Sequence, residues 1–276
     1  MVSPSTRETN NMGQQPLPRK LIQYLPFGIA ALCFLGCILV EILGVELSWE
    51  FRDRFYVDFG NTCYYCSIIL SVIYGRRYGL SWLKSLIFTG LTFVLLFSWV
   101  SVAWGNLDGK IFGVGAVASY RSIIFLPLLG LALSKFCQVD TLNLCDALTP
   151  YFFFNHGIVT VACWLSGCCA GKNMLWGVLN PLNGLVVFPL QACIILLSVG
   201  VAYWGLEYAK KQSYRANGMV FANSLIIYGC GRYVLELFSD DPRMFGVTSW
   251  LGVCSLVMVA LGFLVRRISE KHYQTP

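Results

Sequence analysis

The sequence predicts an all-α, polytopic integral membrane protein with about eight transmembrane helices. Of its 276 residues, 57% are hydrophobic and only 12% are charged, whereas soluble domains carry about twice that charged fraction. The mean hydropathy is +0.64. Apolar runs of about twenty residues, the length that crosses a bilayer, follow one another along the chain.

The chain is predicted to begin with a disordered polar tail, because residues 1–20 are rich in Asn, Gln, Ser and Pro. The apolar run at 25–44 is too long for a signal-peptide core, and no small-residue cleavage site follows it. We therefore expect an added N-terminal span with its outer loop over 21–57, a membrane core over 58–267 and a cytoplasmic tail over 268–276. The seven spans expected in the core are 59–75, 83–104, 112–134, 148–165, 185–205, 216–238 and 248–265.

Lysine and arginine gather in four segments that would share one side of the membrane. These segments are the N-terminal tail, the loops 76–84 and 206–215, and the C-terminal tail. Because cytoplasmic loops are enriched in Lys and Arg, eight spans with both termini in the cytoplasm are expected. The net charge of +6 then reflects topology and attraction to anionic lipid headgroups. The basic residues are dispersed and form no binding motif, so no nucleic-acid partner is expected.

The cysteines do not indicate a metal centre. Many of the twelve lie inside predicted spans, among them Cys33, Cys37, Cys63, Cys66, Cys193, Cys230 and Cys254. A buried free cysteine behaves as a small hydrophobic residue. Cys63 and Cys66 would share one helical face, but they lack a second pair or a neighbouring histidine. We expect no metal and no cofactor.

Polar residues within predicted spans mark the candidate site, because ionisable groups at membrane depth are costly and often functional. Tyr228, Arg232 and Glu236 recur every four residues and so share one helical face. Arg232 and Glu236 form either a structural ion pair, or a site in which Arg232 binds a phosphate oxygen while Glu236 orients it. His156 is either a polar contact between helices or a general base.

The segment "SGCCAGK", residues 166–172, interrupts the apolar pattern. Gly167 and Gly171 would let the chain turn and approach a lipid headgroup closely, and Lys172 would add a positive charge at the outer face. A bridge between the adjacent Cys168 and Cys169 would be strained. We therefore expect a backbone turn here.

Four stretches resemble the prolipoprotein diacylglyceryl transferase family in order and spacing. They are "FGNTCYYCSIILSVIYGRRYGLSW", "DALTPYFFFNHGIVTVACWLSGCCAGK", "FPLQA" and "YGCGRYVLELFSDDP". The resemblance covers residues 58–267 and implies a seven-span core, so 25–44 would be one added span that starts inside. It also implies an enzyme of the bacterial cytoplasmic membrane that transfers a diacylglyceryl group from phosphatidylglycerol to the cysteine thiol of a lipoprotein precursor.

The chain departs from the family pattern at several positions. The family's signature arginine falls at Thr160, and the histidine of its histidine-glycine-glycine motif falls at Tyr120, next to Arg121. The signature's asparagine, glutamate and final arginine fall at Cys163, Cys168 and Lys172. The family residues that are kept include Gly167, Gly171, Gln191, Arg232 and Glu236.

The resemblance implies roles for these residues. Arg232, Arg121 and Lys172 would bind the phosphate, and His156 or Tyr120 would accept the proton of the acceptor. The expected catalytic residues are therefore Arg232, Glu236, His156 and Tyr120. The other expected substrate-binding residues are Gly167, Cys168, Gly171, Gln191 and Tyr228. The alternatives are a non-catalytic relative that binds anionic phospholipid or a membrane partner, and a thiol-based function of Cys163, Cys168 and Cys169, which lack the two-residue spacer of redox motifs.

Overall fold

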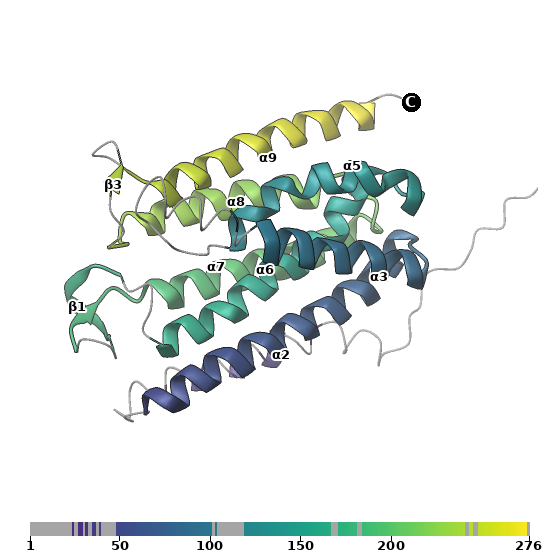
Figure 1. Cartoon of the computed structure of the whole chain (residues 1–276). Coiled ribbons are helices and arrows are strands. Elements are labelled where there is room, and N and C mark those ends of the chain that lie inside the picture. Colours follow the sequence, from purple (N-terminus) through teal and green to yellow (C-terminus); the bar gives the residue numbers. More distant parts are fainter. Residues whose placement is uncertain are drawn as a thin grey trace, which may run out of the picture.

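The computed structural model describes residues 48–100, 103, 119–166, 171–180, 184–240, 243–244 and 248–274, with a few isolated residues between 24 and 39. These residues form a bundle that is mostly helical (Figure 1), as the composition predicted. Two helices are long and apolar enough to cross a membrane, Leu190–Lys211 and Trp250–Lys271. A bent pair, Arg121–Cys137 and Thr141–Leu165, would make a third span. The number of eight spans stays a prediction.

The helices and strands have the labels of Figure 1. The helical elements are α2 (Trp49–Gly75), η1 (Arg76–Tyr78), α3 (Trp82–Leu91), η2 (Thr92–Val100), η3 (Ser119–Phe125), α5 (Leu126–Cys137), α6 (Thr141–Ser166), α7 (Leu190–Lys211), α8 (Met219–Glu236) and α9 (Trp250–Gln274). Two antiparallel hairpins pair β1 (Asn173–Leu179) with β2 (Val186–Val187), and β3 (Arg243–Met244) with β4 (Thr248–Ser249).

Three element boundaries differ from the prediction. Helix α2 begins at Trp49, where Ser48 accepts a capping hydrogen bond from the Phe51 N–H, so part of the expected outer loop is helical. A search for apolar runs misses this turn because it is polar and charged. Helix α7 starts at Leu190 because Val186 and Val187 are paired in a hairpin. The last turn of α7 also contains Lys210 and Lys211, which were expected in a loop. Basic residues in the last turn of a helix interact favourably with the helix dipole.

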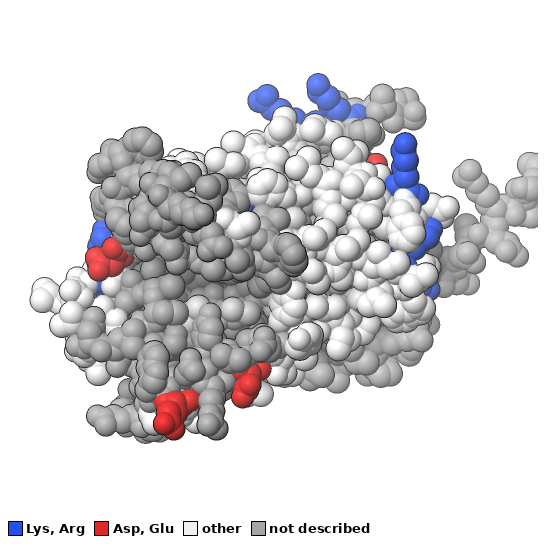
Figure 2. Space-filling view, in the orientation of Figure 1, with Lys and Arg blue, Asp and Glu red and all other residues white. Residues whose placement is uncertain are grey.

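The bundle has two chemically different ends. Helices α2, α5, α7 and α9 finish at one end, called the basic end here, while both hairpins lie at the other, called the hairpin end (Figure 1). The basic residues toward the basic end are Arg76, Arg77, Lys84, Lys135, Lys210, Lys211, Arg215, Arg266, Arg267 and Lys271. Figure 2 shows most of the visible lysine and arginine toward this end and a few at the hairpin end beside acidic side chains, and the white surface next to the basic end carries almost no charge. This separation is the pattern that the positive-inside rule predicts.

Close backbone approach holds α8 against α9. A Cβ atom on Gly229 would lie 2.8 Å from the Ser255 carbonyl oxygen, and one on Gly262 would lie 2.7 Å from that of Ala222. Small residues permit such packing between membrane helices. One face of α8 is therefore buried in the bundle, and side chains on that face are shielded from lipid.

The start of α8 is capped by a side chain from another helix. Gly218, at the N-cap position, offers no side chain. The buried Asp146 of α6 instead accepts hydrogen bonds from the backbone N–H groups of Gly218, at 2.7 Å, and Phe221, at 2.8 Å. Beside it, the Asn143 side-chain oxygen accepts from the Asn217 N–H at 3.1 Å. These contacts fix the basic end of α8 to α6.

Candidate active site

The buried face of α8 carries the three residues whose spacing placed them together. Tyr228, Arg232 and Glu236 are all buried, and the Arg232 guanidinium forms an ion pair with the Glu236 carboxylate. The shared face predicted from their spacing is confirmed. Removing two charges from water is costly, so such a pair needs further hydrogen bonds.

Ser249 supplies one of these hydrogen bonds. Its hydroxyl donates to Glu236 Oε2 at 2.8 Å and accepts from the Gly252 N–H at 3.1 Å. Ser249 ends strand β4, so the β3–β4 hairpin and the first turn of α9 hold the Glu236 carboxylate in place. No sequence motif identified Ser249 as part of the site. The one feature that could have pointed to it is its position just before an apolar helix.

His156 comes from α6 to the same place. Its ring is 5.9 Å from the ring of Tyr228, at an angle of 81°, and it lies close enough to Arg232 to interact with it electrostatically. Tyr228 also packs against Phe153, with ring centroids 4.6 Å apart. His156, Tyr228, Arg232, Glu236 and Ser249 therefore form one group, called the α8 cluster below.

Lys172 makes contacts that the sequence did not predict, while its role as a charge at the outer face stays a prediction. Its Nζ donates to the Leu237 carbonyl at 2.6 Å. Its backbone N–H donates to the Phe238 carbonyl at 2.8 Å, and its carbonyl accepts from the Phe188 N–H at 2.9 Å. The last carbonyls of a helix attract cations. Lys172 thus attaches the β1–β2 hairpin to the end of α8.

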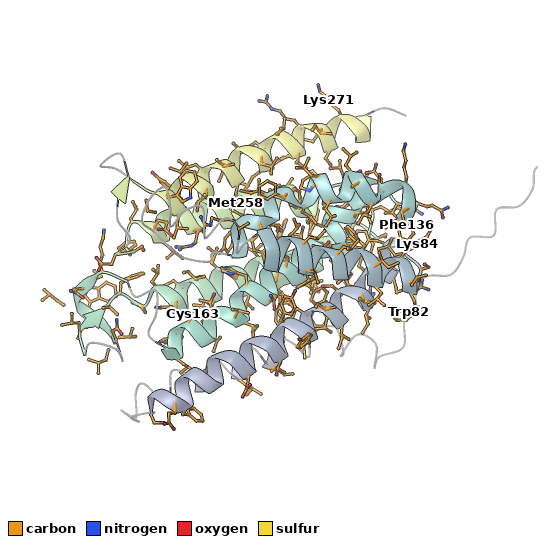
Figure 3. All side chains as sticks on the ribbon, in the orientation of Figure 1. Trp82, Lys84, Phe136, Cys163, Met258 and Lys271 are labelled. Carbon is orange, nitrogen blue, oxygen red and sulfur yellow. The ribbon has the colours of Figure 1, made fainter. Side chains whose placement is uncertain are left out.

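Close packing requires a glycine at position 171, and the group packed against it is protein backbone. It forms an antiparallel bridge with Ser239, and an added Cβ would lie 2.5 Å from the Phe188 carbonyl oxygen. Gly167 and Cys168 lie outside the described residues, so the predicted turn stays a prediction. The Cys163 side chain lies in the half of α6 toward the hairpin end (Figure 3).

The remaining predicted residues lie on other elements. Arg121 is only 1% exposed in η3, and Gln191 is buried in the first turn of α7. The side chain of Tyr120 lies outside the described residues. The Thr160 hydroxyl donates to the His156 carbonyl, one turn earlier in α6, at 2.8 Å. Among the residues that the structure describes, no group of three or more His, Cys, Asp or Glu side chains could hold a metal ion.

Substitutions in the segment 167–172 should distinguish backbone packing from thiol chemistry. Gly171→Val should cause a large loss of lipid-dependent activity, because every side chain at this position collides with Phe188. Cys168→Ser and Cys169→Ser should have small effects. Activity at matched expression is the measurement, with modification by a thiol reagent as the control. Inactivation by one serine substitution alone, with folding intact, would instead support a catalytic thiolate.

Comparison with known proteins identifies relatives. The sequence profile described as prolipoprotein diacylglyceryl transferase matches residues 31–267. The chain is 29% identical over 163 residues to the phosphatidylglycerol–prolipoprotein diacylglyceryl transferase of Clostridium tetani (strain Massachusetts / E88), covering 54% of this chain and 64% of that protein. It is 27% identical over 168 residues to the phosphatidylglycerol–prolipoprotein diacylglyceryl transferase 2 of Clostridium perfringens (strain 13 / Type A), covering 58% and 64%. The alignments thus span slightly less than two thirds of each relative.

Proposed function

Because the chain belongs to the prolipoprotein diacylglyceryl transferase family, we propose that it is a membrane transferase. It would move a diacylglyceryl group from phosphatidylglycerol to a lipoprotein cysteine or a related acceptor. The observation that carries this proposal is the buried ion pair of Arg232 and Glu236, which lies toward the hairpin end of α8. An arginine fixed in this way is well suited to bind a phosphate.

The α8 cluster supplies the groups that this reaction needs. The acceptor sulfur attacks the glyceryl carbon, the bond from that carbon to the phosphate oxygen breaks, and glycerol phosphate leaves with the electron pair. Arg232 would bind the phosphate oxygens through its planar fork of donors, oriented by Glu236 and, through Glu236, by Ser249. His156 would accept the thiol proton at a ring nitrogen.

Further residues are proposed to complete the substrate site. Arg121 would add a second cation for the phosphate. Lys172 would do the same with the ammonium donors that its contact to Leu237 leaves available. The proposed binding residues also include Gly167, Cys168, Gly171, Gln191 and Tyr228, and Tyr120 is a second proposed proton acceptor.

The proposed topology has eight spans in the bacterial cytoplasmic membrane, with both termini inside. At the basic end, the Tyr24 hydroxyl donates to the Glu207 carboxylate, whereas Ser48 caps α2 at the hairpin end. The segment between them is long enough to cross a bilayer core of about 30 Å, since a helix rises about 1.5 Å per residue. This supports an added span before the seven-span core.

Reporter fusions test this topology. Reporters after Lys84 and Lys211 should report a cytoplasmic location, and reporters within 45–48 and 180–184 an external one. A fusion at the C-terminus should report the cytoplasm. A cytoplasmic signal from the β1–β2 hairpin would overturn both the orientation and the proposed position of the site.

A non-catalytic lipid-binding relative is the second candidate. It is favoured by Thr160, which stands at the family's signature arginine and uses its hydroxyl within its own helix. The decisive experiment expresses this chain in a strain depleted of its own transferase. It also follows transfer from labelled phosphatidylglycerol to a lipoprotein-precursor peptide by the purified protein. Rescue and transfer support the enzyme, whereas lipid binding without either supports the second candidate.

A further inference from the structure

The β1–β2 hairpin presents apolar side chains to its surroundings. Leu175 is fully exposed, and Trp176 and Leu179 are each 61% exposed. On the other strand and the turn before it, Val186 and Leu185 are also exposed. The hairpin projects from the hairpin end of the bundle, beyond α7 (Figure 1).

The surface of this hairpin is without charge. Between residues 147 and 206 the sequence contains one charged residue, Lys172, although about a quarter of the residues in soluble domains are charged. Large apolar surfaces of this kind mark a contact with a membrane or with a protein partner.

The position of the hairpin relative to the bundle is fixed by its two ends. Only Phe188 and Pro189 separate β2 from α7, a connection of about 10 Å at most, and α7 is long and apolar enough to cross a membrane. Phe188 stacks on Phe238 at the end of α8 with ring centroids 4.5 Å apart, and Trp176 packs edge-on against Phe188 at 6.1 Å. The hairpin therefore lies at the level where α7 enters the bilayer.

The distribution of the exposed side chains favours lipid over a protein partner. Leu175 and Trp176 lie in a bulge of β1, between Asn173 and Val178, which both pair with Val187. The other exposed apolar side chains lie outside this bulge, near the turn and on β2. A peptide or protein that docks at one place would leave several of these side chains uncovered, whereas lipid surrounds them all.

We propose that the β1–β2 hairpin is a membrane-interface anchor, immersed in the headgroup and upper acyl region of the outer leaflet. Tryptophan is enriched at this depth, and apolar side chains of peripheral elements bury themselves there. Lys172, at the base of the hairpin, would face anionic headgroups. Since Gly171 and Lys172 bind the hairpin to α8, the anchor would hold the α8 cluster at a fixed depth.

Tryptophan fluorescence of the full chain in vesicles tests this proposal without reference to catalysis. The vesicles combine phosphatidylglycerol with phosphatidylcholine carrying bromine either near the headgroup or deep in the acyl chain. Subtracting the emission of Trp176→Phe from that of the unaltered protein isolates Trp176. We expect a short-wavelength component that bromine near the headgroup quenches more strongly than deep bromine or aqueous iodide does. Trp164→Phe is the matched control, because Trp164 is buried in α6 and its removal should leave lipid quenching unchanged.

A second variant separates anchoring from folding. Leu175→Asp alters a side chain that is fully exposed, so the hairpin should still form, but its Trp176 emission should shift to longer wavelength and lose lipid quenching. Trp176 emission that is quenched by iodide and insensitive to brominated lipid would overturn the proposal. So would emission that changes only when an apolar precursor peptide is added, since the occupant would then be a peptide.

Discussion

Replacing Arg232 with alanine is expected to abolish lipid-dependent transfer. Loss of a group that stabilises developing negative charge on a reacting centre costs about 10²–10³ in rate, and here the same group would also bind the substrate. Arg232→Lys should restore little activity, because an ammonium lacks the bidentate fork. The measurement is transfer from labelled phosphatidylglycerol, at protein levels matched by immunoblot.

This substitution needs a control for folding, because it leaves Glu236 as a buried carboxylate without its ion-pair partner. Such a loss costs about 3–5 kcal/mol in buried pairs. The double variant Arg232→Met with Glu236→Gln removes both charges and should recover much of the lost stability without recovering activity. Full activity of Arg232→Ala at normal expression would reduce the pair to a structural contact.

Variants of Glu236 and Ser249 separate the contribution of the carboxylate charge from that of the serine hydroxyl. Glu236→Gln keeps an oxygen that can accept from Ser249 but removes the charge that orients Arg232, so activity should fall strongly. Ser249→Ala removes one hydrogen bond and leaves the ion pair, so its effect should be smaller. A larger effect of Ser249→Ala than of Glu236→Gln would mean that the hydroxyl, and not the charge, governs the site.

The sequence predicted those parts of the fold and site that depend on local periodicity. Apolar runs located most of the helices, and the four-residue spacing of Tyr228, Arg232 and Glu236 placed them on one helical face. Contacts between distant segments were not predictable in this way. The approach of His156 to Tyr228 depends on how α6 crosses α8, which a single sequence does not encode as a pattern.

The segment after α6 shows the limit most clearly. Its glycines and lysine suggested a turn that faces a headgroup, which stays a prediction, but they gave no sign that Gly171 and Lys172 attach a hairpin to the end of α8. The hairpin itself was missed because its apolar residues continue into those of α7, and an apolar run does not distinguish a strand from a helix. The Lys172 side chain contributes to the fold by binding the carbonyl group of Leu237, which lies 65 residues away in the chain.

Asp146 is a third case, and the prediction drawn from it concerns the stability of the fold. Asp146 precedes the predicted fifth span, and nothing in "NLCDALTP" shows that its carboxylate caps another helix. In the structure it accepts from two backbone N–H groups at the start of α8. Helix α8 carries Arg232 and Glu236 toward its other end, so this cap supports the site from a distance of several turns.

Asp146→Ala is expected to lower the free energy of unfolding by about 2–6 kcal/mol, because it leaves two buried donors without a partner and each costs about 1–3 kcal/mol. Asp146→Asn keeps one oxygen acceptor and should lose about half as much. Asp140→Asn is the matched control: its carboxylate caps α6 through the Leu142 N–H at an exposed site, and substitution there should cost less than about 1 kcal/mol. Thermal unfolding of the purified protein in detergent gives the stabilities, and hydrogen exchange over residues 217–221 shows whether the loss begins at the start of α8. Unchanged stability and exchange in Asp146→Ala would mean that other groups hold this end of the helix, and that its cap contributes nothing to the position of Arg232.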